Sequence, residues 1–451
     1  MATTDTSSTV DLKTELARLK VARINKVAPA SASVRKVGLF GDSRAFLSHS
    51  GGGDGSGTQN NLLKGFGLAH WIQAYSEGMA CLPWELQGGV AGDTTKQMLD
   101  RQPAFIEKMK AAGSDLVVVI GGTNDRTGNN LELGQSKVYM QTIVQNFQAA
   151  GIKVIVISDT PRGNGSSAYE LTDAQAADHY AYHLWCENEL SKVCAVVNAW
   201  DSWIDPNTGV KYQPLAKVIR DGIHPSKIGA MLIGKAVGPA VAAHVRQLAH
   251  VLESNVARSA EYPKGALTKN PLVKGTAGSI ASSANPVSGS KLADGWGAEG
   301  ENMAGLTTTW SKEVDAGGVE WQVVKIAGTA TSEKQPAINA YVDVNLSDLV
   351  DQDVIKTTGL VQSEGTGLSN ISAGILITPS WTQKLDCDDS DSTLPWPSEA
   401  SGVVNYETPE LVYDASAGFT LVRSRIEARF PIGATVSATV KFAKFGMRNA
   451  A

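Results

Sequence analysis

Short apolar runs alternate with helix-length segments between about residues 35 and 250. The runs are Val37–Phe40, Leu116–Ile120, Val154–Ile157 and Val193–Val197, and a further short strand is predicted within Glu85–Val90. The intervening segments with a helical pattern are 62–76, 94–112, 132–149, 171–191 and 226–250. Continuous apolar runs are typical of parallel strands that are buried on both faces. The alternation therefore predicts a flavodoxin-like, three-layer α/β domain with five parallel strands.

The pattern changes after about residue 255. Residues 262–300 are rich in Gly, Ser, Ala, Asn and Pro, which indicates a linker and entry loops. Short runs with alternating polarity follow, and they are Glu320–Ile326, Ala337–Val344, Ser372–Thr378, Gly418–Ala428 and Thr435–Phe442. Val, Ile, Thr and Tyr in runs separated by turn residues predict an all-β sandwich resembling a jelly roll.

The opening segment has a pattern of its own. Leu12, Leu16 and Leu19 give a partly helical period that ends near Pro29. We predict a short amphipathic helix that packs on its own chain; pairing with copies of itself is less favoured, because coiled coils need three or more heptads. The predicted organisation is an N-terminal helical segment at 1–33, an α/β domain at 34–254, a linker with entry loops at 255–300, and a β-sandwich at 301–451.

Composition restricts the possible partners. A chain of 451 residues suggests two or three domains, and 42% hydrophobic with 19% charged residues is typical of a folded protein. The net charge is -5 and there is no dense basic run, so we expect no nucleic-acid partner. No apolar run approaches the ~20 residues of a membrane span. Residues 1–10 lack the apolar region of a secretory signal, so we expect synthesis in a cytoplasm.

Cysteine and histidine spacing gives little sign of a metal or cofactor. The four cysteines lack the spacing of a zinc site. Cys186 and Cys194 are close enough in sequence to pair, but free buried thiols are favoured. His179 and His183 lie four apart on a predicted helix, which is also metal-ligand spacing. Because no third ligand is evident, we interpret them as a neighbouring surface pair and predict no metal and no cofactor.

Polar residues directly follow two of the predicted strands. Gly41-Asp42-Ser43 follows the first, and Gly121-Gly122-Thr123-Asn124-Asp125 follows another. The carboxyl ends of parallel strands meet at one edge of a sheet, where ligands bind. Ser43 is there a candidate nucleophile, and the Asn124 amide is a candidate donor to an oxyanion. Taken singly, each segment is equally typical of a turn with a capping residue.

Two further segments supply the remaining parts of such a site. The run from Gly88 to Thr94 offers a glycine, Gly92, whose N–H can face a ligand, although an ordinary helix start capped by Asp93 or Thr94 has the same sequence. In Asp221-Gly222-Ile223-His224-Pro225, an aspartate precedes a histidine by three residues. A nucleophilic serine needs a base, and the base needs an orienting partner on its other nitrogen.

The four segments together resemble the SGNH (GDSL-type) hydrolase family over about residues 35–248. The hallmark residues of that family, in chain order, are matched by Ser43, Gly92, Asn124 and His224. The resemblance implies an ester hydrolase with a flavodoxin-like core, in which Ser43 is the nucleophile, His224 the base and Asp221 its orienter. It further implies an oxyanion hole formed by the Ser43 and Gly92 N–H groups and the Asn124 side chain.

The family name does not choose the ester, because its substrates include lipids, thioesters, small esters and O-acetylated sugars. No long apolar stripe indicates an acyl-chain tunnel. Aromatic residues that suit sugar faces, although buried Trp usually belongs to a core, are Trp71, Trp84, Tyr169, Trp200, Trp203 and Tyr212. A β-sandwich that follows an esterase domain is typical of a carbohydrate-binding module, which we expect for residues 301–451. The stretches 269–278 and 294–296 resemble the start of jelly-roll domains in phage tail proteins. We therefore expect a carbohydrate O-acetylesterase that acts on a bacterial surface polysaccharide, as part of a phage tail.

Two other functions stay open at this point. One is a lipase or thioesterase of small acyl esters, and the other is a non-catalytic receptor-binding or structural tail protein. A homotrimer formed through the N-terminal helix or the β domain is a further expectation. The glycine-rich stretch 51–57 is either a lid near Ser43 or a surface insertion.

Overall fold

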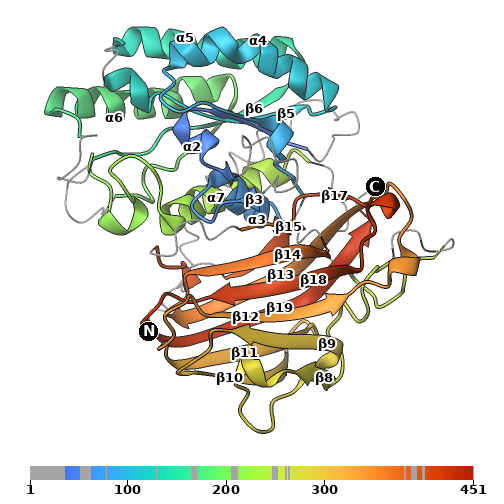
Figure 1. Ribbon diagram of the computed structural model, residues 1–451. Coiled ribbons are helices and arrows are strands. Elements are labelled where there is room, and N and C mark those ends of the chain that lie inside the picture. Colours follow the sequence, from blue (N-terminus) through green and yellow to red (C-terminus); the bar gives the residue numbers. More distant parts are fainter. Residues whose placement is uncertain are drawn as a thin grey trace, which may run out of the picture.

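The computed structural model describes residues 36–50, 62–77, 79–127, 131–163, 170–204, 212–245, 252–259, 262, 265–379, 382–387, 394–398 and 402–449. The N-terminal helix predicted within residues 1–33 and the glycine-rich stretch 51–57 lie outside these residues, as does Tyr169. An α/β part and an all-β part lie one against the other (Figure 1).

The α/β part contains a five-stranded parallel sheet in the order β4-β1-β5-β6-β7. Its strands are β1 (Gly38–Gly41), β4 (Gln87–Gly89), β5 (Leu116–Ile120), β6 (Lys153–Ile157) and β7 (Ala195–Val197). This is the strand order of flavodoxin-like sheets, and the predicted fold class is confirmed. A short hairpin of β2 (His49–Ser50) and β3 (Leu62–Leu63) lies apart from the sheet.

Helices cover both faces of this sheet (Figure 1). They are α2 (Ser43–Phe46), α3 (Leu68–Tyr75), α4 (Thr95–Ala111), α5 (Leu133–Ala149), α6 (Asp173–Asn188) and α7 (Lys227–Ala242). Met98, Phe147 and Tyr182, from α4, α5 and α6, share one core, whereas Trp71 and Ile233, from α3 and α7, belong to another. The two cores on opposite faces give the predicted three layers.

The all-β part consists of two sheets with mostly antiparallel pairs. One has the order β10-β11-β19-β13-β16, with β17 beside β13, and the other has the order β15-β14-β18-β12-β9-β8. The strands of the first are β10 (Leu306–Val314), β11 (Glu320–Thr329), β13 (Val354–Thr366), β16 (Val403–Glu407), β17 (Leu411–Val412) and β19 (Thr435–Asn449). Those of the second are β8 (Ala277–Ile280), β9 (Leu292–Glu301), β12 (Ala337–Asp343), β14 (Asn370–Thr378), β15 (Thr382–Leu385) and β18 (Leu421–Arg429). Trp310 and Val440 of one sheet share a core with Ile338 and Ile426 of the other.

The prediction of a linker with entry loops at 255–300 differs from the structure. Strands β8 and β9 lie in this stretch, and β9 pairs with β12. In β9 the buried Trp296 and Ala298 alternate with Gly295, Gly297 and Glu299, so the strand has little of the Val, Ile and Thr that marks strands in a sequence. The sequence pattern therefore missed a strand whose inward face is nevertheless apolar.

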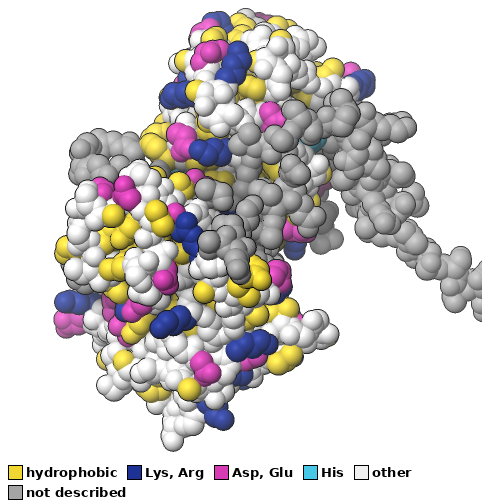
Figure 2. Space-filling model, turned by 90° about the vertical axis from the view of Figure 1, so that its right-hand side faces the viewer, with side chains coloured by type: hydrophobic (Ala, Val, Ile, Leu, Met, Phe, Trp, Pro, Cys, Tyr) yellow, Lys and Arg dark blue, Asp and Glu magenta, His cyan; other side chains and the backbone are white. Residues whose placement is uncertain are grey.

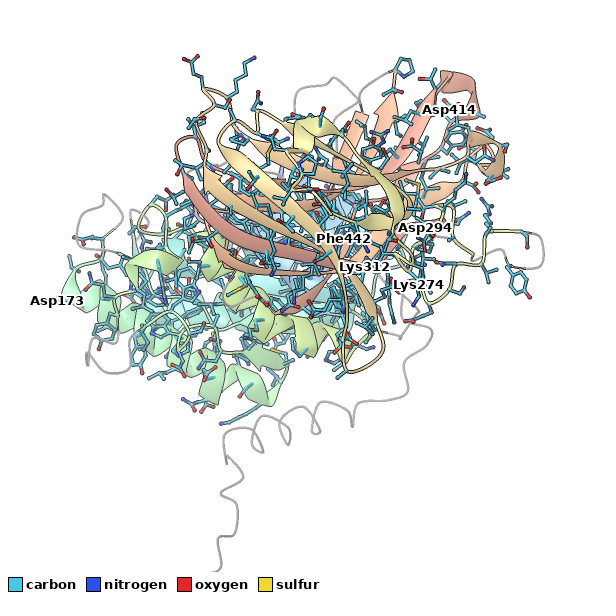
Figure 3. All side chains as sticks on the ribbon, turned by 90° about the horizontal axis from the view of Figure 1, so that it is seen from below. Asp173, Lys274, Asp294, Lys312, Asp414 and Phe442 are labelled. Atoms are coloured by element: carbon cyan, nitrogen blue, oxygen red, sulfur yellow. The ribbon has the colours of Figure 1, made fainter. Side chains whose placement is uncertain are left out.

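The stretch 269–278, at the start of the all-β part, is hydrogen-bonded to β9. Asp294 accepts hydrogen bonds from the backbone of Ala277 at 2.6 Å, and Lys274 and Lys312 both pair with Glu320 at 3.2 and 3.1 Å. Lys274, Lys312 and Asp294 lie close together on this side of the domain (Figure 3). Lys274 of this stretch thus has an acidic partner within the domain.

The two parts share a buried interface. The Gln73 amide on α3 donates to the carbonyl of Glu407 at 2.8 Å, and Trp71 packs on Trp396 with ring centroids 5.2 Å apart. Lys227, the first residue of α7, is buried and donates to the carbonyl of Ser369 at 2.5 Å. The all-β part is therefore packed directly on the two helices that cover one face of the α/β sheet.

A cavity of about 180 Å³ lies at this interface. Its lining includes His49, Trp84 and Glu85 from the α/β part and Glu410 from the all-β part. None of the five site residues predicted from the sequence lines it.

Candidate active site

Ser43 lies at the first turn after β1, at the carboxyl edge of the sheet. Asp42 caps the short helix α2, and its carboxylate accepts a hydrogen bond from the Arg44 N–H at 2.9 Å. A side chain at Gly41 would approach the Ile120 carbonyl to 2.1 Å, so a glycine is required where β1 passes closest to β5. This turn presents Ser43 with 7% of its surface exposed.

The serine is hydrogen-bonded to a histidine that comes from the far end of the domain. His224 Nε2 lies 2.9 Å from Ser43 Oγ, and His224 Nδ1 lies 2.7 Å from Asp221 Oδ2. A proton on Nδ1 that is donated to this carboxylate makes Nε2 the nitrogen that accepts the serine proton. The structure therefore brings Ser43, His224 and Asp221 together in the order that general-base activation of a hydroxyl needs.

Asp221 is organised by its own turn. Its Oδ1 accepts hydrogen bonds from the N–H groups of His224 at 2.8 Å and Ile223 at 3.2 Å. Partial burial opposes ionisation, but the hydrogen bonds from the His224 side chain and backbone outweigh it and lower the pKa of Asp221 to about 2. The carboxylate is therefore charged at neutral pH and stabilises an imidazolium at His224.

Gly92 and Asn124 are connected to the serine turn through neighbouring residues. Gly92 has a φ of +82°, which favours glycine, and it lies at the surface. The Val90 N–H donates to the Gly41 carbonyl at 3.0 Å, and Asn124 Nδ2 donates to the Asp93 carbonyl at 3.0 Å. The two segments predicted to supply oxyanion donors therefore lie at the same sheet edge as Ser43.

Sequence reasoning missed a buried ionic cluster beneath this edge. Arg44 donates to Asp42 through Nε at 3.0 Å and NH2 at 2.6 Å, and it also pairs with Asp159 and with Thr160 Oγ1 at 3.1 Å. All four residues are at most 1% exposed. Burial would raise the pKa of Asp159, but the Arg44 charge lowers it. Asp159 follows β6 as Asn124 follows β5, so the rule that indicated Asn124 also applied to Asp159.

The prediction that His179 and His183 form a surface pair is wrong. Both side chains are buried on the sheet side of α6. His179 Nε2 lies 2.9 Å from the Thr160 carbonyl, and His183 Nδ1 lies 3.0 Å from Ser158 Oγ. Burial lowers the pKa of His179 to about 4, so its ring is neutral at pH 7. Their four-residue spacing reflects contacts with the segment after β6, which a helical pattern alone does not reveal.

Other sequence interpretations concern cysteines, metals and membranes. Cys186 and Cys194 form no disulfide, as the sequence favoured; Cys186 is buried as expected, whereas Cys194 is only partly buried. Among the described residues, no three His, Cys, Asp or Glu side chains are grouped to hold a metal ion. No helix of the described part is both long and apolar enough to cross a membrane.

The triad lies at the carboxyl edge of a flavodoxin-like sheet, and its serine, histidine and aspartate are hydrogen-bonded in that order. These features define a serine hydrolase domain. Residues 39–232 match the model of the GDSL-like lipase/acylhydrolase family, and together with the triad this match identifies the α/β domain as an ester hydrolase domain. The resemblance stated from the sequence is thereby confirmed for this domain.

Comparison with other proteins gives matches of similar extent. A GDSL-like lipase from Bacteroides thetaiotaomicron is 17% identical, covers 51% of this chain and 96% of its own, and has a TM-score of 0.34. A carbohydrate esterase of family 3 from Talaromyces cellulolyticus is 17% identical, covers 46% and 96% of the two chains, and has a TM-score of 0.32. No curated protein matches the sequence.

Replacing Asn124 with alanine tests the predicted oxyanion donor. We expect kcat for p-nitrophenyl acetate to fall on the order of 10²–10³-fold, because the amide is one of the donors available to a developing oxyanion. The side chain is only partly buried, so the far-ultraviolet circular dichroism should not change. Asn188→Ala is the matched control, since that exposed amide donates only to the Leu184 carbonyl of its own helix. Full activity of Asn124→Ala would exclude the donor role.

Proposed function

We propose that this ester hydrolase removes O-acetyl groups from a bacterial surface polysaccharide. The observation that carries the proposal is an aromatic cluster at the catalytic edge of the sheet. Tyr180 packs on Trp200 and on Tyr212, with ring centroids 5.4 Å apart in both pairs. Trp200 is buried and follows β7, whereas Tyr212 is 38% exposed. A tyrosine ring that packs on other aromatic rings presents a flat apolar face and a polar hydroxyl, and this combination suits a sugar ring.

The distance between this cluster and Ser43 suits a polymeric substrate, because the two lie at the ends of strands that are three positions apart in the sheet. Neighbouring strands lie about 4.8 Å apart, so the end of β7 is about 14 Å from the end of β1 across β5 and β6. A chain of a few sugar residues spans that distance, whereas the alcohol part of a small ester does not. Of the other aromatic residues considered from the sequence, Trp71 and Trp203 are buried in the core.

The geometry supports acyl transfer in two steps. Ser43 Oγ attacks the acetyl carbonyl carbon while His224 Nε2 takes the hydroxyl proton, and the oxyanion that forms faces Gly92 and Asn124. The ester C–O bond then breaks, and His224 returns the proton to the sugar oxygen. Water, deprotonated by His224, attacks the acetyl-serine. Acetate leaves and Ser43 recovers its proton.

Acetate release from native polysaccharides tests the proposal. We expect the protein to release acetate from at least one member of a panel of O-acetylated bacterial capsules, and none from the same material deacetylated with alkali. Tyr212→Ala should lower kcat/KM on that polymer and leave p-nitrophenyl acetate hydrolysis unchanged. A steep preference for p-nitrophenyl esters with longer acyl chains would instead favour a lipase or thioesterase. Binding of polymer without turnover would favour a receptor-binding protein.

The proposal extends to a phage tail as the setting. Its support is the resemblance of residues 269–278 and 294–296 to tail-protein domains. Charges of both signs are interspersed over the face of the all-β part that Figure 2 shows, which suits neutral or mixed partners. Copurification of the esterase with intact virions, at the mass of three chains per unit, is the expected result. An esterase found only apart from virions would contradict this setting.

A further inference from the structure

The guanidinium of Arg101, on α4, contacts three segments of the site edge at once. Its NH2 donates to the Gly41 carbonyl at 2.6 Å, its NH1 donates to the Gly88 carbonyl at 2.7 Å, and its Nε donates to the Asp93 carboxylate. The same group stacks over the Phe40 ring at 4.4 Å. Arg101 thus bonds the end of β1, the strand β4 and the loop that follows β4.

Asp93 links this arginine to both predicted oxyanion donors. Its carboxylate accepts from Arg101, its carbonyl accepts from Asn124 Nδ2, and Gly92 is its neighbour in the chain. A side chain added at Gly92 would meet no atom within 4 Å, so the loop is not held by packing at that point. Its position depends on the anchors to either side, which include the Val90 bond to Gly41 and the Arg101 bond to Asp93.

We propose that Arg101 is a positioning residue for the oxyanion hole, acting through Asp93 on Gly92 and Asn124. The proposal rests on the serine esterase assignment. A planar guanidinium reaches three acceptors in fixed directions, which the single ammonium of a lysine does not. Arg101 also donates to the Gly41 carbonyl, two residues before Ser43. The same side chain therefore holds the oxyanion donors and the nucleophile in fixed positions relative to one another.

Such a residue affects kcat more than KM. An oxyanion donor must lie about 2.7–3.1 Å from the position that the oxyanion occupies, and that bond strengthens as charge develops. A displaced donor therefore weakens binding of the transition state more than binding of the ester. A residue that only supported the fold would alter stability without this split.

Arg101→Gln and Arg101→Lys test the proposal with p-nitrophenyl acetate. We expect kcat to fall at least ~10-fold in both variants, with KM changed by less than about twofold. Lys96→Gln, which removes an exposed ion pair with Asp100 at 2.6 Å on the same helix, is the matched control and should not alter kcat. Should Arg101→Gln fail to fold, Asp93→Asn keeps the backbone and the side-chain shape and should give the same split.

A double-mutant cycle with Asn124→Ala separates positioning from general support. If Arg101 acts through the oxyanion hole, Arg101→Gln should cost much less in kcat when Asn124 is already alanine. Additive losses, or an unchanged kcat in Arg101→Gln and Asp93→Asn beside an active wild type, would overturn this inference alone. A wild type that hydrolyses neither p-nitrophenyl acetate nor any O-acetylated polysaccharide would overturn the esterase assignment together with it.

Discussion

Ser43→Ala is expected to abolish ester hydrolysis while leaving the fold intact. The hydroxyl is the atom that lies 2.9 Å from His224 Nε2, and alanine cannot form an acyl intermediate. Removing the nucleophile of a serine–histidine–aspartate triad lowers kcat on the order of 10⁶-fold in a well-studied protease. Alanine keeps the Cβ of Ser43 and removes one hydroxyl from the short helix α2, so the packing of the sheet should not change. The measurement is p-nitrophenyl acetate hydrolysis by both proteins, beside their circular dichroism spectra.

Ser191→Ala is the control for this prediction. Ser191 is exposed, and its hydroxyl donates to the Glu187 carbonyl far from the triad in the chain, so the activity should equal that of the wild type. If Ser43→Ala is as active as the wild type, Ser43 is not the nucleophile. If both proteins are inactive on the small ester but the wild type releases acetate from a polysaccharide, the triad acts only on the polymer.

The sheet could be predicted from sequence because its central strands β1, β5 and β6 are buried on both faces. A run such as Leu116–Ile120 is apolar at every position, and helices of regular period separate one run from the next. The site followed from the sheet, because polar residues after neighbouring parallel strands must meet at one edge. Ser43 and Asn124 were found by that rule, whereas His224 was found as the base that a nucleophilic serine needs, with Asp221 three residues before it as the orienting partner.

The remaining features depend on contacts that no local pattern contains. The partner of Arg44 is Asp159, 115 residues away, and a buried arginine resembles a surface arginine in a sequence. Strand β9 is glycine-rich, and its inward face appears only when β12 pairs with it. The contact of Lys227 with Ser369 likewise depends on how the α/β part and the all-β part pack together. In each case the signal is a pairing of distant segments.

Replacing Arg44 with methionine is expected to lower the free energy of unfolding by about 3–5 kcal/mol, because it leaves buried carboxylates without their cation. Asp42 and Asp159 are both 0% exposed, and methionine fills similar space without a charge. Urea denaturation at pH 7, followed through loss of esterase activity and through circular dichroism, measures the change. Lys110→Met, which removes an exposed ion pair with Glu107, is the control and should change stability by less than about 1 kcal/mol.

The pH dependence separates this electrostatic effect from a packing defect. In the wild type the pKa of Asp159 is lowered, because the Arg44 charge outweighs burial, so its stabilising effect is present at neutral pH and lost as the pH falls through that lowered value. Without Arg44, burial raises the pKa of Asp159, and the penalty for the charged form disappears once the carboxyl is protonated. The stability difference between wild type and Arg44→Met should therefore shrink as the pH falls from 7 towards 4. The double variant Arg44→Met/Asp159→Asn should regain part of the stability that Arg44→Met loses at pH 7. A stability difference between wild type and Arg44→Met that does not change with pH would show that lost packing, rather than the uncompensated charge, destabilises the variant.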